Sequence, residues 1–306
     1  MHVVVTGGNG FVGRHVVSLL RKKGVGKLTI PDHTRCDLRE YTQCLHAIGG
    51  ADYVIHLAGN VGGIGYNEAN SATLFDDNVL MGVNILRASR DAKVKKFIGI
   101  GTVCAYPKFT PVPFREEDLW NGYPEETNAA YGLAKKMLLV QSQAYRKQYG
   151  MNCIYLLPAN IYGPGDSFDV SSSHVIPALI RQMEEAKRKK KEMVHVWGTG
   201  RATREFLYVE DAARAIVLAS ERYNGGEPVN IGSGYEVSIR ELADAIASTV
   251  GFTGAIHFNP KKPDGQPRRK LDTQKASALF GFTAVTPFQK GLKETVLWYR
   301  KNRLSL

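Results

Sequence analysis

The stretch that decides the fold stands near the N-terminus and reads Val3-Val-Val-Thr-Gly7-Gly-Asn-Gly10-Phe-Val-Gly13. An apolar strand runs into a tight glycine turn, and an amphipathic helix follows to about Lys23. Gly7 permits the turn, Gly10 lets the backbone approach a pyrophosphate, and Gly13 lets helix and strand pack closely. Because a helix N-terminus offers free N–H groups and a positive dipole end to phosphate, the stretch predicts a dinucleotide-binding turn.

Short apolar runs follow this turn and alternate with helical patterns. They are rich in Val, Ile and Leu with little polar alternation, as is typical of strands that a parallel sheet buries on both faces. Helical patterns at 75–90 and 131–149 each place apolar residues on one stripe. This alternation predicts an α/β fold, a doubly wound parallel sheet with right-handed crossovers. The predicted strands are His2–Thr6, Lys27–Ile30, Tyr53–Ala58, Lys96–Gly101 and Cys153–Pro158.

Proline and glycine interrupt the pattern beyond about residue 160. We therefore expect a dinucleotide-binding domain over 1–165 and a smaller, mainly substrate-binding α/β domain over 166–306, with segments around 205–232 returning to the first domain. Ser238-Ile-Arg-Glu241 is a capping box that should open a helix over 239–250. Thr286-Pro-Phe-Gln289 should do the same for a last helix ending near Arg300.

Composition excludes several classes of protein. Of 306 residues, 43% are hydrophobic, yet no apolar run approaches the roughly 20 residues of a membrane helix. The four cysteines form no C-x-x-C pair, so we expect reduced thiols in a cytoplasmic protein with neither a leader nor a bound metal. The net charge of +11 is partly local, in Lys187–Lys191 and Arg268–Lys270, and we expect a solvated basic face there. No zinc spacing or aromatic-interleaved basic repeat supports nucleic-acid binding.

Tyr131-Gly-Leu-Ala-Lys135 is the candidate catalytic motif. Residues i and i+4 share one helix face, so the phenol and the ammonium should point into the same site. A nearby cation stabilises phenolate and is expected to lower the pKa of Tyr131. Thr102, at the end of the fourth predicted strand, supplies a hydroxyl that could orient a substrate oxygen.

The glycine turn, Thr102 and the Tyr131/Lys135 pair together resemble the extended short-chain dehydrogenase/reductase family. Members of that family bind nicotinamide dinucleotides on a Rossmann fold and act mostly on nucleotide sugars. Further stretches resemble its GDP-L-fucose synthase branch, which converts GDP-4-keto-6-deoxy-D-mannose to GDP-L-fucose by 3,5-epimerisation through enolates and hydride reduction at C4. These stretches are Asn60–Ile64, Gly101–Lys108, Asn160–Pro164, Ser173–Leu179, Val196–Gly198, Arg204–Leu207 and Lys262–Gly265.

The resemblance implies a role for each matching residue. Tyr131 would donate the proton in ketone reduction, with Lys135 as its partner and a ribose contact, and Thr102 stands where the family has Ser. Cys104 and His174 would form the epimerisation pair, which suits two groups that change protonation near neutral pH. The implied cofactor contacts are Gly7, Gly10, Phe11, Val12, Gly13, Asp32, Arg35, Leu57, Ala58, Lys135, Pro158, Asn160 and Ile161. The implied contacts to the GDP-sugar are Arg181, Trp197, Arg204 and Asp264.

The choice of cofactor is left open by the sequence. Asp32, which suits the free ribose of NAD, and Arg35, which suits the 2′-phosphate of NADP, both follow the second strand. We expect NADP(H), with NAD(H) as the alternative. Two alternative functions stay open. The first is an epimerase of GDP- or other NDP-sugars that retains its NAD and makes no net reduction, and the second is a non-catalytic, dinucleotide-sensing regulator. The helices at 75–90 and 131–149 should pair across a two-fold axis, as in the family, to give a homodimer with a four-helix bundle.

Overall fold

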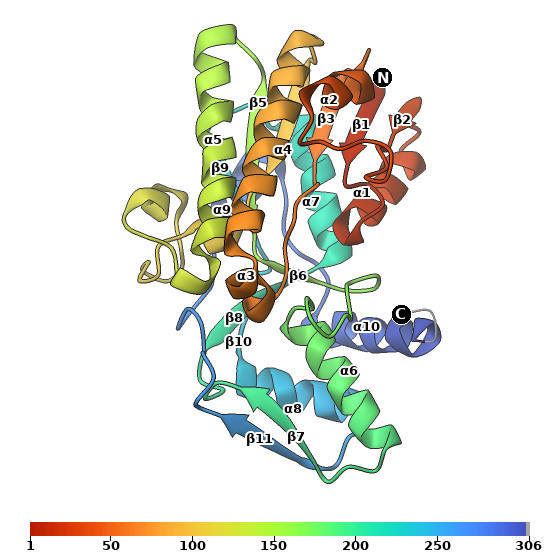
Figure 1. Ribbon diagram of the computed structural model, residues 1–306, viewed down its shortest axis with the longest axis vertical. Coiled ribbons are helices and arrows are strands. Elements are labelled where there is room, and N and C mark those ends of the chain that lie inside the picture. Colours follow the sequence, from red (N-terminus) through yellow and green to blue (C-terminus); the bar gives the residue numbers. More distant parts are fainter. Residues whose placement is uncertain (304–306) are drawn as a thin grey trace.

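Six parallel strands form the central sheet of the computed structural model, which describes residues 1–303. Their order is β2-β1-β3-β4-β5-β9, and all five pairings are parallel (Figure 1). The α/β prediction and the five predicted strands are confirmed, and β9 adds a sixth. The strands are β1 (His2–Thr6), β2 (Lys27–Thr29), β3 (Tyr53–His56), β4 (Lys96–Ile100), β5 (Cys153–Pro158) and β9 (Pro228–Ile231).

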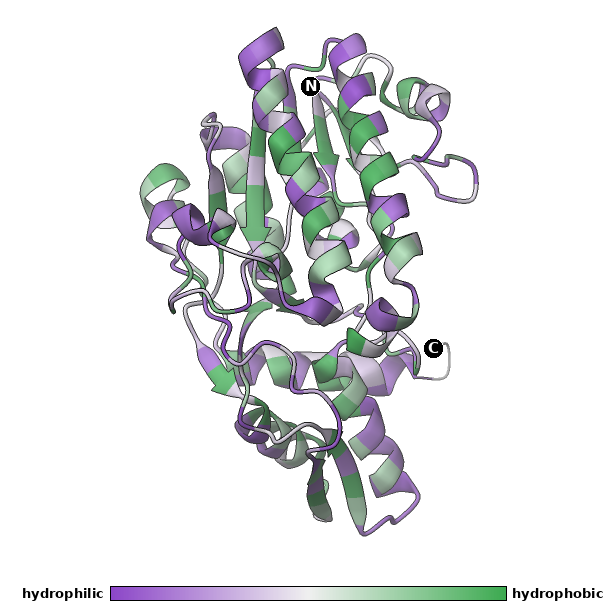
Figure 2. Ribbon diagram, turned by 60° about the vertical axis from the view of Figure 1, so that its left-hand side comes forward, coloured by the Kyte–Doolittle hydropathy of each residue, from purple (hydrophilic) through white to green (hydrophobic). Residues whose placement is uncertain are grey.

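Helices cover both faces of this sheet. On one side α1 (Phe11–Lys22) packs on α7 (Val209–Arg222), and on the other α4 (Ser71–Asp91) lies between α2 (Tyr41–Ile48) and α5 (Ala129–Tyr149). All residues of β1, β4, β5 and β9 are buried, which explains their unbroken apolar runs. The strands are accordingly the most hydrophobic part of the ribbon, and the outer helical faces are the most hydrophilic (Figure 2).

A second hydrophobic cluster lies beyond the carboxyl ends of these strands, in the lower half of Figure 1. Two small sheets belong to this part: β6 (Asn160–Tyr162) with β8 (Thr203–Tyr208) and β10 (Glu236–Ser238), and β7 (Met193–Trp197) with β11 (Ala255–Asn259). The helices around them are α6 (Val175–Arg188), α8 (Ile239–Val250) and α10 (Phe288–Asn302). The remaining elements are α3 (Ile64–Ala69), α9 (Gln274–Phe280) and the short 3-10 helices η1 (Val103–Ala105), η2 (Glu116–Trp120) and η3 (Glu126–Asn128).

The two predicted helix caps have different outcomes. The capping box is confirmed, because Ser238 Oγ accepts from the Glu241 N–H at 3.1 Å and Glu241 accepts from the Ser238 N–H at 2.8 Å. The Thr286 cap is wrong: α10 starts at Phe288, and Pro287 occupies the cap position. The Thr286 N–H instead donates to the buried carboxylate of Asp211 at 2.9 Å, a long-range contact that local spacing does not reveal.

The order of the strands positions the site. The chain passes from β1 to β2 on one side and then returns to place β3 on the other side of β1. Ligands of open α/β sheets bind outside the carboxyl ends of the strands at such a reversal. No helix within residues 1–303 has the length and apolar character needed to cross a membrane.

Candidate active site

A cavity of about 1230 Å³ runs from the glycine turn after β1 to the second hydrophobic cluster. Its walls come from the carboxyl ends of the central strands and from α6, β7, β8 and the 263–269 segment. Among the residues predicted from the sequence, these line the cavity: Gly7, Gly10, Phe11, Val12, Gly13, Leu57, Ala58, Thr102, Cys104, Tyr131, Lys135, Pro158, Asn160, Ile161, His174, Arg181, Trp197, Arg204 and Asp264.

The glycine turn forms a backbone cradle at one end of the cavity. Gly7 has a φ of +68°, a conformation that favours glycine, and a Cβ there would lie 2.7 Å from the Ala58 nitrogen. A Cβ on Gly13 would lie only 2.0 Å from the Gly7 oxygen. Gly10 stands at the N-cap of α1 and opens the helix toward the cavity. The cradle therefore fits a dinucleotide pyrophosphate, because no side chain blocks the approach to the N–H groups of the first helical turn.

Two residues predicted to contact the cofactor are not brought to the cavity. Among the described residues of this loop, Pro31, His33 and the four residues Cys36–Arg39 line the wall, and Asp32 and Arg35 do not. The half-exposed Asp32 carboxylate accepts hydrogen bonds from the Thr34 N–H at 3.0 Å and the Thr34 hydroxyl at 2.9 Å. The Asp32 side chain thus closes a local turn, as Asp residues after a strand commonly do.

Arg39 is the basic residue at this end of the cavity, and sequence reasoning missed it. Its guanidinium forms ion pairs with Asp37 at 2.8 Å and with Asp77 at 3.0 Å. The residues predicted from the sequence, Asp32 and Arg35, lie close after β2, whereas the loop continues to Tyr41 at the start of α2. The available signal was a second arginine in the loop, one residue before the N-cap Glu40 of α2.

Tyr131 and Lys135 lie on one face of α5, as their spacing predicts. The Lys135 Nζ lies 5.9 Å from the centroid of the Tyr131 ring. The expectation that Lys135 lowers the pKa of Tyr131 is wrong for this structure: burial, followed by the charge of Cys104, raises that pKa. Burial also lowers the pKa of Lys135 to about 8. Tyr131 is therefore a protonated phenol at neutral pH, and the Thr102 hydroxyl nearby accepts a hydrogen bond from the Cys104 N–H at 3.1 Å.

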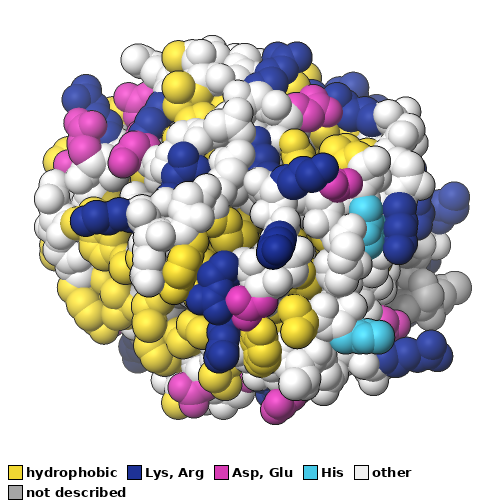
Figure 3. Space-filling view, turned by 90° about the horizontal axis from the view of Figure 1, so that it is seen from above, with side chains coloured by type: hydrophobic (Ala, Val, Ile, Leu, Met, Phe, Trp, Pro, Cys, Tyr) yellow, Lys and Arg dark blue, Asp and Glu magenta, His cyan; other side chains and the backbone are white. Residues whose placement is uncertain are grey.

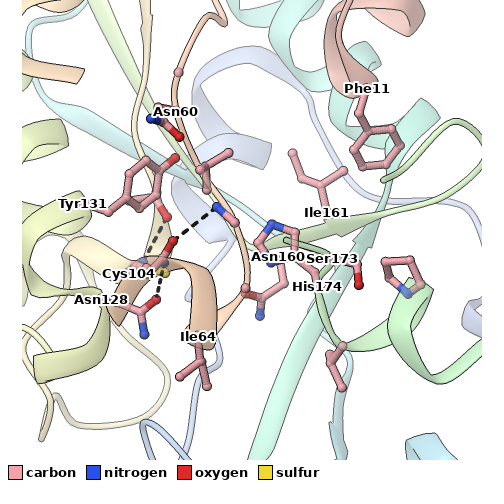
Figure 4. Close-up of a pocket in the computed structure, with 18 of the residues that line it drawn as sticks. Phe11, Asn60, Ile64, Cys104, Asn128, Tyr131, Asn160, Ile161, Ser173 and His174 are labelled. Atoms are coloured by element: carbon pink, nitrogen blue, oxygen red, sulfur yellow. Dashed lines mark hydrogen bonds between the residues drawn. The ribbon is translucent and has the colours of Figure 1, made fainter. Parts of the chain in front are cut away.

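Cys104 and His174 approach the cavity from different elements. Cys104 lies on η1, beside Tyr131, and His174 is the N-cap residue of α6 across the cavity (Figure 4). The loop before His174 is tied to the N-terminus of α3 by a hydrogen bond from the Gly63 N–H to the Ser172 carbonyl at 2.9 Å. His174 is exposed to the cavity, and the desolvation that the cavity walls impose, followed by the charge of Arg269, lowers its pKa. The cavity can thus place a thiol and an imidazole around one small molecule.

Polar side chains at the far end of the cavity are held in different ways. Arg204 is buried, and its guanidinium donates to the carbonyls of Thr203, Asp264 and Gln266 rather than to Glu205. Burial and Arg269 lower the pKa of Arg204 to about 9, so it stays charged at neutral pH. The Asp264 carboxylate accepts hydrogen bonds from the Thr199 N–H at 2.8 Å and the Thr199 hydroxyl at 2.9 Å, so it braces a loop.

Trp197 and Arg181 are the other two predicted substrate contacts. The half-exposed Trp197 ring carries the Lys262 ammonium 4.9 Å from its centroid. Within residues 1–303, the buried Nε of Arg181 has no hydrogen-bond partner. An unpartnered guanidinium nitrogen in the wall of a cavity favours an anionic or carbonyl-bearing ligand.

Arg269 is the second residue of the site that sequence reasoning missed. The stretch Arg268–Lys270 reads as a solvated basic group, yet Arg269 is only 6% exposed and lines the cavity. One of its nitrogens lies 3.4 Å from the Cys104 sulfur. Its neighbour Arg268 points outward and pairs with Glu236 at 2.7 Å. Among the described residues, no group of three or more His, Cys, Asp or Glu side chains could hold a metal ion.

Comparisons with known proteins agree with this geometry. Residues 3–232 match the NAD dependent epimerase/dehydratase family. GDP-L-fucose synthase 1 of Arabidopsis thaliana is 40% identical over 98% of this chain and 93% of its own length. A GDP-6-OMe-4-keto-L-xylo-heptose reductase from C. jejuni superposes with a TM-score of 0.92 at 27% identity, covering 98% of both chains.

A second solved structure carries a cofactor. The GDP-L-fucose synthetase from Naegleria fowleri bound to NADP superposes with a TM-score of 0.89 at 32% identity, covering 99% of this chain and 95% of that one. The glycine cradle, the Tyr131/Lys135 pair and similarity over nearly the whole length lead to one assignment. The chain belongs to the NAD dependent epimerase/dehydratase family, within the extended short-chain dehydrogenases/reductases.

Proposed function

We propose that this enzyme converts GDP-4-keto-6-deoxy-D-mannose to GDP-L-fucose, with NADPH as reductant. One observation carries the proposal: a single cavity joins the dinucleotide cradle to the Tyr131/Lys135 pair and to Cys104 and His174. The similarity to GDP-L-fucose synthase 1 over nearly the full length of both chains supports the same substrate.

Epimerisation would use Cys104 and His174. The ketone at C4 acidifies the protons on C3 and C5, so a base can remove one of them and leave an enolate. Returning a proton to the other face inverts the carbon. Groups on two sides of the substrate are therefore needed, and the thiol on η1 and the imidazole at the start of α6 meet this requirement.

Reduction would use Tyr131, Lys135 and Thr102. The bound nicotinamide supplies a hydride to C4. The Tyr131 phenol donates its proton to the C4 oxygen, and its raised pKa keeps that proton in place at neutral pH until the oxygen becomes strongly basic. The buried Lys135 ammonium holds positive charge beside the phenol, and the Thr102 hydroxyl can donate a hydrogen bond to the same oxygen.

The nucleotide part of the substrate would lie at the far end of the cavity. Arg204 and Arg181 supply guanidinium groups for the diphosphate, since guanidinium binds phosphate oxygens bidentately. Trp197 offers a half-exposed aromatic face at the rim. Asp264, whose carboxylate is engaged by Thr199, would act mainly by holding the loop that carries Arg204's carbonyl partners.

The preference for NADPH is supported by Arg39 rather than by Arg35. A 2′-phosphate needs a cation near the adenosine ribose, and Arg39 with His33 lines that end of the cavity. The Asp32 carboxylate does not line the cavity and accepts hydrogen bonds from Thr34, so it is not placed to face the phosphate. The structure of the Naegleria fowleri relative with NADP bound points the same way.

We further propose a cytoplasmic homodimer formed through α4 and α5. These helices lie side by side and carry the exposed apolar residues Leu80, Val83, Met137 and Val140. A view from the end where both helices terminate shows hydrophobic side chains gathered on one side of the surface (Figure 3). A contiguous apolar surface of this kind is typical of a subunit interface.

The test follows two reactions in D2O at once: deuterium uptake at C3 and C5, and loss of NADPH absorbance. Wild type should show both, whereas Cys104→Ser and His174→Gln should lose deuterium uptake more than hydride transfer. His257→Gln, an exposed histidine outside the cavity, is the matched control and should behave as wild type. Isomerisation without NADPH loss would instead identify an epimerase that retains NAD, and neither reaction would identify a binding protein.

A further inference from the structure

The guanidinium of Arg269 forms an unusual contact with a thiol. Its Nη1 lies 3.4 Å from Cys104 Sγ and 3.4 Å from Asn160 Oδ1, and its Nε donates to Gln266 Oε1 at 3.0 Å. Gln266 is itself buried and held by the carbonyls of Pro107 and Lys108. The Arg269 side chain is therefore fixed in place with one edge against the sulfur.

Among the described residues, the positive charge of Arg269 has no carboxylate partner. Within residues 1–303, none of the ion pairs involves Arg269, and its amide contacts are neutral. Arg204, the neighbouring buried cation, is likewise bound only to backbone carbonyls. Buried charges are normally paired, so a buried guanidinium without a carboxylate partner favours an anion in contact with it.

Cys104 is placed to be that anion. A guanidinium has only donors, so in the 3.4 Å contact the sulfur must accept. A thiolate accepts far better than a thiol, and a neighbouring arginine is a recognised way of stabilising it. The other ionisable groups around Cys104 are Tyr131, a neutral phenol at neutral pH, and Arg204, a second cation. His174 lies across the cavity (Figure 4).

We propose that Arg269 is a positioning residue that stabilises the thiolate of Cys104 and thereby makes Cys104 the proton acceptor in epimerisation. This inference rests on the proposed function. The thiolate takes the proton from the carbon beside the ketone and becomes a thiol, and the C–H electron pair remains on the substrate as the enolate. His174 then relays a proton from solvent to the opposite face of the enolate, and the Cys104 thiol releases its proton to solvent, so both groups return to their starting states.

The first experiment measures the thiol without substrate. Cys104 alkylation by iodoacetamide at pH 7 is followed by peptide mass spectrometry in wild type, Arg269→Gln and Arg269→Lys. Arg268→Gln is the matched control, since that arginine is exposed and paired with Glu236. Arg269→Gln should slow alkylation of Cys104 about tenfold or more, Arg269→Lys should recover part of the rate, and Arg268→Gln should match wild type. An unchanged rate in Arg269→Gln overturns the inference.

A second measurement needs no arginine variant, in case Arg269→Gln fails to fold. Thiolate absorbs near 240 nm, so wild type at pH 7 should absorb more than Cys104→Ser by about one thiolate per chain. Equal absorbance overturns the inference.

A third measurement separates this inference from the proposed function. In Arg269→Gln, the kcat for deuterium uptake at C3 and C5 should fall, and the rate of hydride transfer should fall less. If the wild type takes up no deuterium, the proposed function fails while the alkylation result still stands. If Arg269→Gln raises only KM and leaves alkylation unchanged, Arg269 binds substrate and does not act on the thiol.

Discussion

Replacing Lys135 by methionine should stabilise the protein while abolishing reduction. The side chain is 5% exposed, and within residues 1–303 its ammonium has no hydrogen bond or ion pair. Burial lowers the pKa of Lys135 from 10.5 to about 8, which means that folding disfavours the charged form. Methionine keeps a similar length and volume but carries no charge.

The magnitude follows from this pKa. One pKa unit corresponds to about 1.4 kcal/mol, so at pH 7 the buried charge costs about 3 kcal/mol of folding free energy. Between pH 8 and 10.5 the unfolded chain binds the proton and the folded chain does not. The free energy of unfolding of the wild type should therefore rise with pH across that window. Lys135→Met should raise the free energy of unfolding by about 3 kcal/mol at pH 7. Its free energy of unfolding should lack the part of the increase between pH 8 and 10.5 that Lys135 causes in the wild type.

The adjacent Lys136 is a matched control. Burial lowers its pKa to about 8 as well, but its ammonium donates to the Leu119 carbonyl at 2.5 Å and lies 4.9 Å from the centroid of the Trp120 ring. Lys136→Met would leave a buried carbonyl unpaired, which costs about 1–3 kcal/mol. This cost offsets the stabilisation gained by removing the buried charge. The variant should change stability little and leave reduction intact.

Urea unfolding at pH 7 and pH 10, with NADPH oxidation measured on the same preparations, checks both expectations. Lys135→Met should reduce at least about 100-fold more slowly than wild type. A free energy of unfolding at or below that of wild type would refute the reasoning about the buried charge. Reduction at the wild-type rate would refute the role of Lys135.

The remaining predictions concern five other residues. Tyr131→Phe should slow reduction at least about 100-fold while the dinucleotide still binds, as followed by NADPH fluorescence; normal turnover would remove the proton-donor role. Arg39→Ala should lower kcat/KM for NADPH but not for NADH, and Asp32→Ala should change neither value. An equal loss of kcat/KM for both cofactors in Arg39→Ala would exclude a contact between Arg39 and the 2′-phosphate. Burial raises the pKa of Asp166 to about 7 from 3.8. The folded state thus holds a proton that the unfolded state has released, so the free energy of unfolding should fall as pH rises from about 4 to 7. Urea unfolding at several pH values checks this, because the fall should be absent in Asp166→Asn. Val140→Glu on the exposed face of α5 should convert the dimer to a monomer in sedimentation, and a wild-type monomer at micromolar concentration would count against the interface.

The features that local sequence predicted are those with local causes. The turn after β1 needs glycine because of backbone sterics within a few residues, as the 2.0 Å approach at Gly13 shows. The buried strands follow from continuous apolar runs, and the capping box of α8 follows from the spacing of Ser238 and Glu241. The shared face of Tyr131 and Lys135 follows from the helical repeat.

Other features depend on contacts between distant segments. Arg268 and Arg269 are indistinguishable as a pair of basic residues, yet one pairs with Glu236 in solvent and the other lies buried against Cys104. Likewise, Thr286 is engaged by Asp211 from another helix and so does not cap α10, and Asp32 folds back onto Thr34. The pKa of Tyr131 rises because packing removes it from water, an effect that the Tyr/Lys spacing does not contain. Spacing determines which side chains share a face, but burial and electrostatics depend on what the rest of the chain places against that face, and only the tertiary structure decides that.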